Sequence, residues 1–254
     1  LPPFTIKGTI WEGRRLHELY AEAMTPWDWQ PKLKKLADSL GLHLFSSPFD
    51  ATAVDFLEKM GAPAYKVASF ENGDIPLLRK VAATRKPVIV STGMATLETV
   101  EEALSTLKNA GSGPVALLKC TSAYPAPPEE MNLRAIPALA SRFGVPVGLS
   151  AHTLGHTVAV AARALGACIF EKHFILSRKT GGPDSSFSME PSEFADMVSA
   201  IRDTEKALGN GIIGLSEREK PAYAYRRSIF VVKDVKSGDA FSTGLISPSI
   251  AITA

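Results

Sequence analysis

Long hydrophobic runs are absent from this chain of 254 residues, and no stretch approaches the roughly 18 consecutive apolar residues that a membrane-spanning helix needs. A signal peptide, in which a charged start precedes an apolar stretch, is also lacking at the N-terminus. We therefore expect a protein that has no membrane partner and works in the cytoplasm.

Cysteine is scarce and neither sign of charge dominates. The two cysteines, Cys120 and Cys168, lie inside apolar strand-like runs, which predicts two buried thiols in a reducing compartment rather than a disulfide. Lys and Arg total 28 against 26 Asp and Glu, so the net charge is only +2 and no basic block stands out. This balance argues against a nucleic-acid partner.

Hydrophobic residues make up 45% of the chain and charged residues 21%, which is ordinary for a globular enzyme with a large core. Apolar runs bounded by turn residues predict six strands, over Leu42–Ser47, Tyr65–Ser69, Val88–Thr92, Ala116–Thr121, Val145–Ser150 and Cys168–Phe174.

Amphipathic segments alternate with these runs. Apolar residues recur at helical spacing over 97–107, with Thr96 as the predicted N-cap and Gly111 as the stop, and again over 191–208 after Pro191. Alternating strands and helices predict a parallel sheet with right-handed crossovers. An open doubly wound sheet also fits, but no Gly-x-Gly-x-x-Gly follows a strand, and polar residues mark most strand ends. We therefore favour a TIM (β/α)8-type barrel.

Six strands are two fewer than such a barrel requires. Residues 1–13 have the pattern of a loop, so we expect a barrel that lacks its first two strands, over 1–215. A polar linker at 216–226 precedes an extended, β-rich segment at 227–254, which predicts the start of a small second domain.

Two histidines follow two neighbouring predicted strands, at positions 152 and 173. Because the carboxyl ends of barrel strands meet on one face, His152 and His173 can bind one metal ion there. Each histidine could instead satisfy only a local hydrogen bond.

Lys66 lies inside a predicted strand, where an ammonium needs an anionic ligand or an ion-pair partner. Glu71 is either that partner or an acid/base group. Hydroxyl residues at other strand ends suit a phosphate or carboxylate, although each could simply cap a turn or helix. Tyr124 is expected to line the site, and Asp184 to bind substrate hydroxyls or to cap the segment after it.

Five motifs together resemble the sialic acid synthase family, whose members condense phosphoenolpyruvate with an N-acetylated amino sugar. They are Tyr65-Lys-Val-Ala-Ser-Phe-Glu71, Ser91-Thr-Gly-Met94, Lys119-Cys-Thr-Ser-Ala-Tyr-Pro125, Gly148-Leu-Ser-x-His-Thr153 and Glu171-Lys-His-Phe174. The segment Thr25-Pro-Trp-Asp-Trp29 is most similar to the branch that makes pseudaminic acid. The resemblance spans the whole chain and identifies 227–254 with the start of the family's antifreeze-like (SAF) domain.

The resemblance implies a reaction and a set of roles. C3 of phosphoenolpyruvate attacks the aldehyde of a 2,4-diacetamido-2,4,6-trideoxy hexose of altrose type, water adds at C2, and phosphate leaves. His152 and His173 correspond to ligands of a divalent metal, most suitably Mn²⁺, with Mg²⁺ or Co²⁺ as alternatives. Glu71 corresponds to a carboxylate at the reacting centre. The positions that bind phosphoenolpyruvate in the family correspond to Ser47, Lys66, Ser69, Ser122 and Ser150. The positions that face the sugar correspond to Tyr124 and Asp184.

Ala151 departs from the family, which usually has Asp between this Ser and His. On a strand, residue 151 points away from Ser150 and His152, so the missing Asp is expected to support the site rather than to bind the metal. Three alternatives stay open: a neuraminate synthase, a legionaminate synthase, and an inactive fragment that only binds ligands. The resemblance also implies a homodimer.

Overall fold

The computed structural model of the protein describes residues 5–240, 242–244 and 246–250. It consists of two compact units, Leu1–Leu208 and Gly209–Ala254. Within the described residues, no helix is both long and apolar enough to cross a membrane.

The first unit is built on a parallel sheet whose strands follow one another in sequence order. They are β1 (Tyr65–Val67), β2 (Val88–Ser91), β3 (Val115–Cys120), β4 (Val147–Ala151) and β5 (Phe170–Lys172). Five of the six predicted strands are therefore confirmed.

The strand predicted over Leu42–Ser47 is wrong. Only Ser46 pairs, through a single parallel bridge to Tyr65 in which the Lys66 N–H donates to the Ser46 carbonyl at 3.2 Å. Leu42 is 59% exposed and Phe45 is 37% exposed, so these apolar residues have no packed layer to enter. An apolar run without such a layer does not form a strand.

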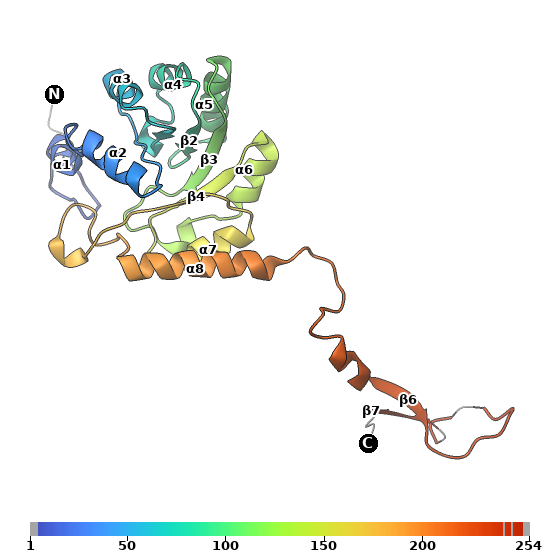
Figure 1. Cartoon of the computed structure of the whole chain (residues 1–254). Coiled ribbons are helices and arrows are strands. Elements are labelled where there is room, and N and C mark those ends of the chain that lie inside the picture. The colour runs from blue at the N-terminus through green and yellow to red at the C-terminus, as the bar shows by residue number, and fades with distance from the viewer. Residues whose placement is uncertain (1–4, 241, 245, 251–254) are drawn as a thin grey trace. The chain divides into compact units, whose positions relative to one another are not determined.

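Helices follow each strand and cover the outside of the sheet, as Figure 1 shows for α3 to α8. Their bounds are α3 (Ala51–Lys59), α4 (Ile75–Ala82), α5 (Leu97–Asn109), α6 (Ala135–Phe143), α7 (Thr157–Ala164) and α8 (Pro191–Leu208). The predicted N-cap of α5 is confirmed, because the Thr99 N–H donates to Thr96 Oγ1 at 3.3 Å. Besides α3, two more helices precede β1, namely α1 (Leu16–Ala23) and α2 (Gln30–Ser39).

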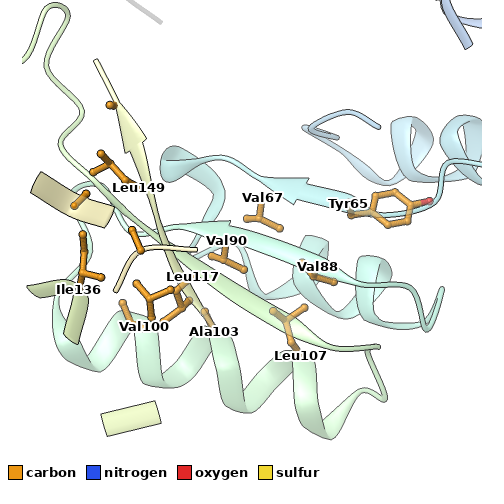
Figure 2. Packing of buried hydrophobic residues seen from close by; sticks show 14 of the residues in the cluster. Tyr65, Val67, Val88, Val90, Val100, Ala103, Leu107, Leu117, Ile136 and Leu149 are labelled. Carbon is orange, nitrogen blue, oxygen red and sulfur yellow. The ribbon is translucent and has the colours of Figure 1, made fainter. Parts of the chain in front are cut away.

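The core lies between the sheet and these helices. Figure 2 shows Val88 and Val90 of β2 and Leu117 of β3 facing α5, from which Leu107 packs against them. All four side chains are at most 2% exposed. Burying a side chain of this size contributes about 1.5–3 kcal/mol to the stability of the fold, so this layer holds the strands in place against α5.

The sheet is strongly curled. Lys66 of β1 and Glu171 of β5 belong to opposite edge strands, yet Lys66 Nζ lies 3.4 Å from Glu171 Oε2. In a flat sheet, four strand spacings would separate these edges by roughly 19 Å. The first unit is thus a parallel α/β half-barrel whose concave face gathers side chains from both edges.

Cys120 is buried as predicted, but Cys168 is exposed, so the prediction of two buried thiols is half wrong. Cys168 precedes β5, and its neighbour Ala167 occupies the core instead. Both thiols are free.

The second unit contains a short 3-10 helix, η4 (Pro221–Tyr225), and an antiparallel pair, β6 (Arg227–Val231) with β7 (Ile246–Ile250). Every side chain of β6 is exposed. The predicted divisions at 1–215, 216–226 and 227–254 stay predictions.

Candidate active site

A lysine and a carboxylate meet on the concave face. Lys66 is 8% exposed, and its ammonium lies 3.4 Å from Glu171 Oε2. The Ser150 hydroxyl donates to the other carboxylate oxygen, Glu171 Oε1, at 2.7 Å. Strands β1, β4 and β5 thus bring a lysine, a serine and a carboxylate together on the concave face.

The partner of Lys66 differs from the one considered in the sequence. Glu171, not Glu71, forms the ion pair, and sequence reasoning did not place Glu171 in the site. The signal was present, because residues two apart on a strand share a face, and Glu171 is two positions before His173.

Two hydroxyl side chains, those of Ser69 and Ser122, lie against Gly93 just after β2. The Gly93 N–H donates to Ser69 Oγ at 3.2 Å, and a Cβ at Gly93 would lie 2.5 Å from that oxygen and would also overlap Ser122 Oγ. Ser122 Oγ in turn lies 3.9 Å from Cys120 Sγ. Ser69 and Ser122 are therefore brought together, and they can approach the backbone this closely only because residue 93 has no side chain.

Two further groups lie here, Ser91, whose hydroxyl the sequence analysis placed at a strand end, and Cys120, which it did not assign to the site. The hydroxyl of Ser91 is buried and has no hydrogen-bond partner among the described residues. Burial raises the pKa of the Cys120 thiol, but hydrogen bonds to His152 and Ser69 and the charge of His152 outweigh burial and lower the pKa to about 7. Ser91 is the last residue of β2 and Cys120 the last residue of β3, so their positions at strand ends could have identified both as site residues.

Ser47 lies apart from this group. It lines a separate cavity of about 600 Å³, together with Thr25, Trp27 and Asp50. No hydrogen bond joins it to Lys66 or Ser69 in the described part of the chain, although its neighbour Ser46 pairs with β1.

His152 and His173 lie side by side. Their ring centroids are 5.2 Å apart in an edge-to-face arrangement. His152 Nδ1 is 2.9 Å from the Thr121 carbonyl, and His173 Nδ1 is 3.3 Å from Asp184 Oδ2. Because a carbonyl only accepts, Nδ1 of His152 is the donor in this hydrogen bond.

This donor set fits a divalent ion. Both imidazoles are oriented through Nδ1 by oxygen acceptors, the usual outer support of metal-binding histidines. No cluster of three or more His, Cys, Asp or Glu side chains suited to a metal occurs among the described residues. Two nitrogen ligands with the remaining positions left to water or substrate oxygens suit Mn²⁺ better than a closed structural zinc site.

Aromatic rings surround the histidines. The Tyr124 ring lies 4.3 Å from the His152 ring, and Phe187 lies 5.0 Å from the His173 ring. Trp11 packs 5.3 Å from Tyr124 and donates its indole N–H to the Pro183 carbonyl at 2.8 Å. Burial raises the pKa of Tyr124 to about 12, so its hydroxyl is a proton donor at neutral pH. Trp11 and Phe187 were missed, because no local pattern marks them.

Glu71 lies in a different part of the candidate site from the two histidines. Its Oε2 atom is buried and has no hydrogen-bond partner in the described structure. Burial raises the pKa of this carboxyl, repulsion from Asp74 raises it further, and Lys66 opposes the rise. Glu71 lines a second cavity of about 600 Å³ beneath α1.

The last residue of α1, Ala23, connects these regions. It lines the Ser47 cavity, the Glu71 cavity and a third cavity of about 230 Å³ that contains His173 and Asp184. The sequence analysis did not predict that helix α1 would lie against these cavities.

Comparison with known proteins adds the following findings. The sequence profile of the NeuB family matches residues 2–213. The chain is 43% identical to a pseudaminic acid synthase of Helicobacter pylori, over 94% of this chain and 71% of that protein. It is 42% identical to an N,N'-diacetyllegionaminic acid synthase of Campylobacter jejuni, over 82% of this chain and 63% of that protein. A crystal structure of N-acetylneuraminic acid synthetase from Leptospira borgpetersenii, in complex with citrate, superposes with a TM-score of 0.76 at 33% identity, covering 82% of this chain and 73% of that one.

Proposed function

The chain belongs to the NeuB family, and we propose that it is a pseudaminic acid synthase. It condenses phosphoenolpyruvate with a 2,4-diacetamido-2,4,6-trideoxy hexose of altrose type and water, giving pseudaminic acid and phosphate. The observation that carries this proposal is the 43% identity to pseudaminic acid synthases over 94% of the chain.

The concave face provides the groups that phosphoenolpyruvate needs. Lys66 supplies the charge, Ser69 and Ser122 supply hydroxyl donors, and Ser150 orients Glu171 beside Lys66. Ser47 contributes from its neighbouring cavity. Held in this way, the enol carbon C3 faces the sugar, and orientation of two substrates is worth several kcal/mol of barrier.

The sugar occupies the mouth beside the histidines. Tyr124 and Asp184 bind its hydroxyls, and Glu71, whose pKa is raised by burial, moves a proton at the reacting centre. His152 and His173 would hold a divalent metal, most suitably Mn²⁺, with Mg²⁺ or Co²⁺ as alternatives. When bound, it would supply Lewis-acid polarisation of the aldehyde. After the C–C bond forms, water adds at C2 and the C–O bond to phosphate breaks.

Three structural proposals accompany this function. The half-barrel corresponds to a TIM-type barrel without its first two strands, which the superposition with the Leptospira synthetase supports. Residues 227–254 correspond to the start of an antiparallel antifreeze-like (SAF) domain, consistent with the β6–β7 pair. The working protein is a homodimer in the cytoplasm, where phosphoenolpyruvate is available.

The test is phosphate release from phosphoenolpyruvate by the full-length protein with Mn²⁺ and each of three sugars. These are the altrose-type diacetamido sugar, the corresponding legionaminic acid precursor and N-acetylmannosamine. We expect the highest kcat/KM with the first. Preference for the second would instead make the protein a legionaminate synthase, the alternative that 42% identity supports. If no phosphate is released with any of the three sugars, the proposal is overturned in favour of a binding protein without activity.

A further inference from the structure

A hairpin-like arm precedes α1 and carries Trp11 near its turn. Thr5 and Arg15 form an antiparallel bridge, and the Gly13 N–H donates to the Ile6 carbonyl at 3.0 Å. Because these hydrogen bonds join the two sides of the arm, they hold the turn between them in one place. The Trp11 side chain is half-buried, so it packs against another part of the chain.

Two parts of the candidate site meet the Trp11 side chain. Its ring lies 5.3 Å from the Tyr124 ring and 6.4 Å from the Phe187 ring, the latter edge-on. Its indole N–H donates to the Pro183 carbonyl at 2.8 Å, across 172 positions of sequence. An indole has one donor and no acceptor, so this bond satisfies it. A single side chain thus joins the aromatic wall to the loop that carries Asp184.

The loop that carries Asp184 begins with two flexible residues. Gly181 and Gly182 have φ angles of 73° and 122°, in the region that favours glycine, and glycine leaves the backbone more freedom than any other residue. In the described structure, two polar contacts reach the next two residues from outside the loop. One is the indole bond to Pro183, and the other places His173 Nδ1 3.3 Å from Asp184 Oδ2. The indole is therefore the contact that ties this end of the loop to the arm.

We propose that Trp11 is a positioning residue for sugar binding, an inference that rests on the proposed function. Its ring holds the Tyr124 side chain, and its N–H holds the backbone beside Asp184, so the two sugar-facing groups keep their separation before the sugar arrives. Groups that are ordered in advance bind more tightly, because less freedom is lost on binding. Among the described residues, the hydrogen bonds and ring contacts of Trp11 include neither Lys66 nor Ser69. Its effect should therefore fall on the sugar and spare phosphoenolpyruvate.

Two substitutions separate the ring of Trp11 from its N–H. Trp11→Phe keeps an aromatic ring and removes the donor, whereas Trp11→Ala removes both. Trp29→Phe and Trp29→Ala are the matched controls, because Trp29 is 55% exposed and precedes α2. For each full-length protein, kcat and both KM values are measured, and the reduced diacetamido sugar is titrated calorimetrically. Hydrogen–deuterium exchange at 181–188 is followed without any ligand.

We expect Trp11→Phe to raise the KM and the dissociation constant of the sugar about 2- to 12-fold, the effect of one neutral hydrogen bond. Trp11→Ala also loses the aromatic packing and should raise both about 10- to 100-fold. Exchange at 181–188 should be faster in both variants than in the wild type. The KM of phosphoenolpyruvate should stay within about twofold, and the Trp29 variants should match the wild type.

Unchanged exchange at 181–188 would overturn the positioning role, and so would equal rises in the KM of both substrates or a loss confined to kcat. In each of these cases wild-type turnover leaves the proposed function standing. A wild-type protein that neither binds nor converts the sugar would overturn the proposed function and this inference together, even if exchange showed that Trp11 holds the loop.

Discussion

Ala151 of β4 and Lys172 of β5 are paired in register on the sheet surface that faces away from the catalytic groups. Lys172 donates to the Thr153 carbonyl, directly after His152, and no carboxylate lies within ion-pair distance of it among the described residues. Burial lowers the pKa of Lys172 to about 8, although Glu193 opposes this shift. Ala151, at 4% exposure, therefore stands where a carboxylate would meet a buried ammonium.

We predict that Ala151→Asp pairs with Lys172 and steadies the strand end that carries His152. Mn²⁺ affinity, measured by calorimetry, should rise about tenfold, whereas the KM of the sugar should hardly move. The pKa of Lys172 should rise, because the ionised partner favours its charged form. Ala151→Asn has the same size without charge, and an equal gain from it would rule out the ion pair.

His152→Ala and His173→Ala should each weaken Mn²⁺ binding at least about 100-fold, because each removes one of two nitrogen ligands. His43→Ala, at an exposed histidine far along the chain from both, is the control and should leave the affinity unchanged. Unaltered metal affinity in either site variant would show that the histidines only make local hydrogen bonds.

Lys66→Met should raise the KM of phosphoenolpyruvate about 10- to 100-fold, because a charge-assisted contact is worth about 1.5–3 kcal/mol. The variant also leaves Glu171 without its cation. Lys80→Met breaks an exposed pair with Asp55 and serves as the control. A change confined to the KM of the sugar would contradict the anion assignment.

Gly93→Ala should cut kcat/KM for phosphoenolpyruvate about tenfold or more, since the new methyl group displaces the Ser69 and Ser122 hydroxyls. At Gly73 the nearest atom to a Cβ is Thr99 Cγ2 at 3.9 Å, so Gly73→Ala tests the general cost of losing glycine. Similar kinetics for both variants would mean that the hydroxyl cluster does not hold the substrate.

Glu71 should make the stability depend on pH. Burial raises its pKa above the ordinary value of 4.5, so the folded protein prefers the protonated form. Relative to Glu71→Gln, the wild-type free energy of unfolding should be highest below pH 4.5 and should fall as the pH rises through the raised folded pKa. Urea unfolding across this range measures the difference, and a difference that grows with pH would contradict the assignment.

An exposed carboxyl supplies the comparison. The pKa of Glu98 is lowered by a hydrogen bond to its own backbone N–H and by Thr96, so Glu98→Gln should show the opposite slope.

Strand positions could be predicted because each true strand has apolar residues that enter a helix-covered layer, as Val88 and Val90 do. The run at Leu42–Ser47 has the same local pattern, and only the tertiary structure shows that nothing covers it. Local hydrophobicity indicates that a segment can be buried, and neighbouring elements decide whether it is.

The positions of Lys66 on a strand and of His152 after a strand were predictable in the same way, since both follow from the strand pattern alone. The pairing of Lys66 with Glu171 was not, because it joins the first and last strands and depends on the curl of the sheet. The aromatic wall formed by Trp11 and Phe187 was equally hidden, since it depends on how loops cross the mouth.

Ala23 borders three cavities at once, and this position gives substitutions there a distinctive kinetic signature. A larger side chain at Ser47, Glu71 or Asp184 disturbs one ligand and spares the others. Enlarging Ala23 narrows the approach of phosphoenolpyruvate, sugar and metal together, so all three apparent affinities weaken in parallel. A substitution in any one of the three cavities should therefore be non-additive with a substitution at Ala23. Double-mutant cycles that combine the two measure how strongly each cavity is coupled to the others through Ala23.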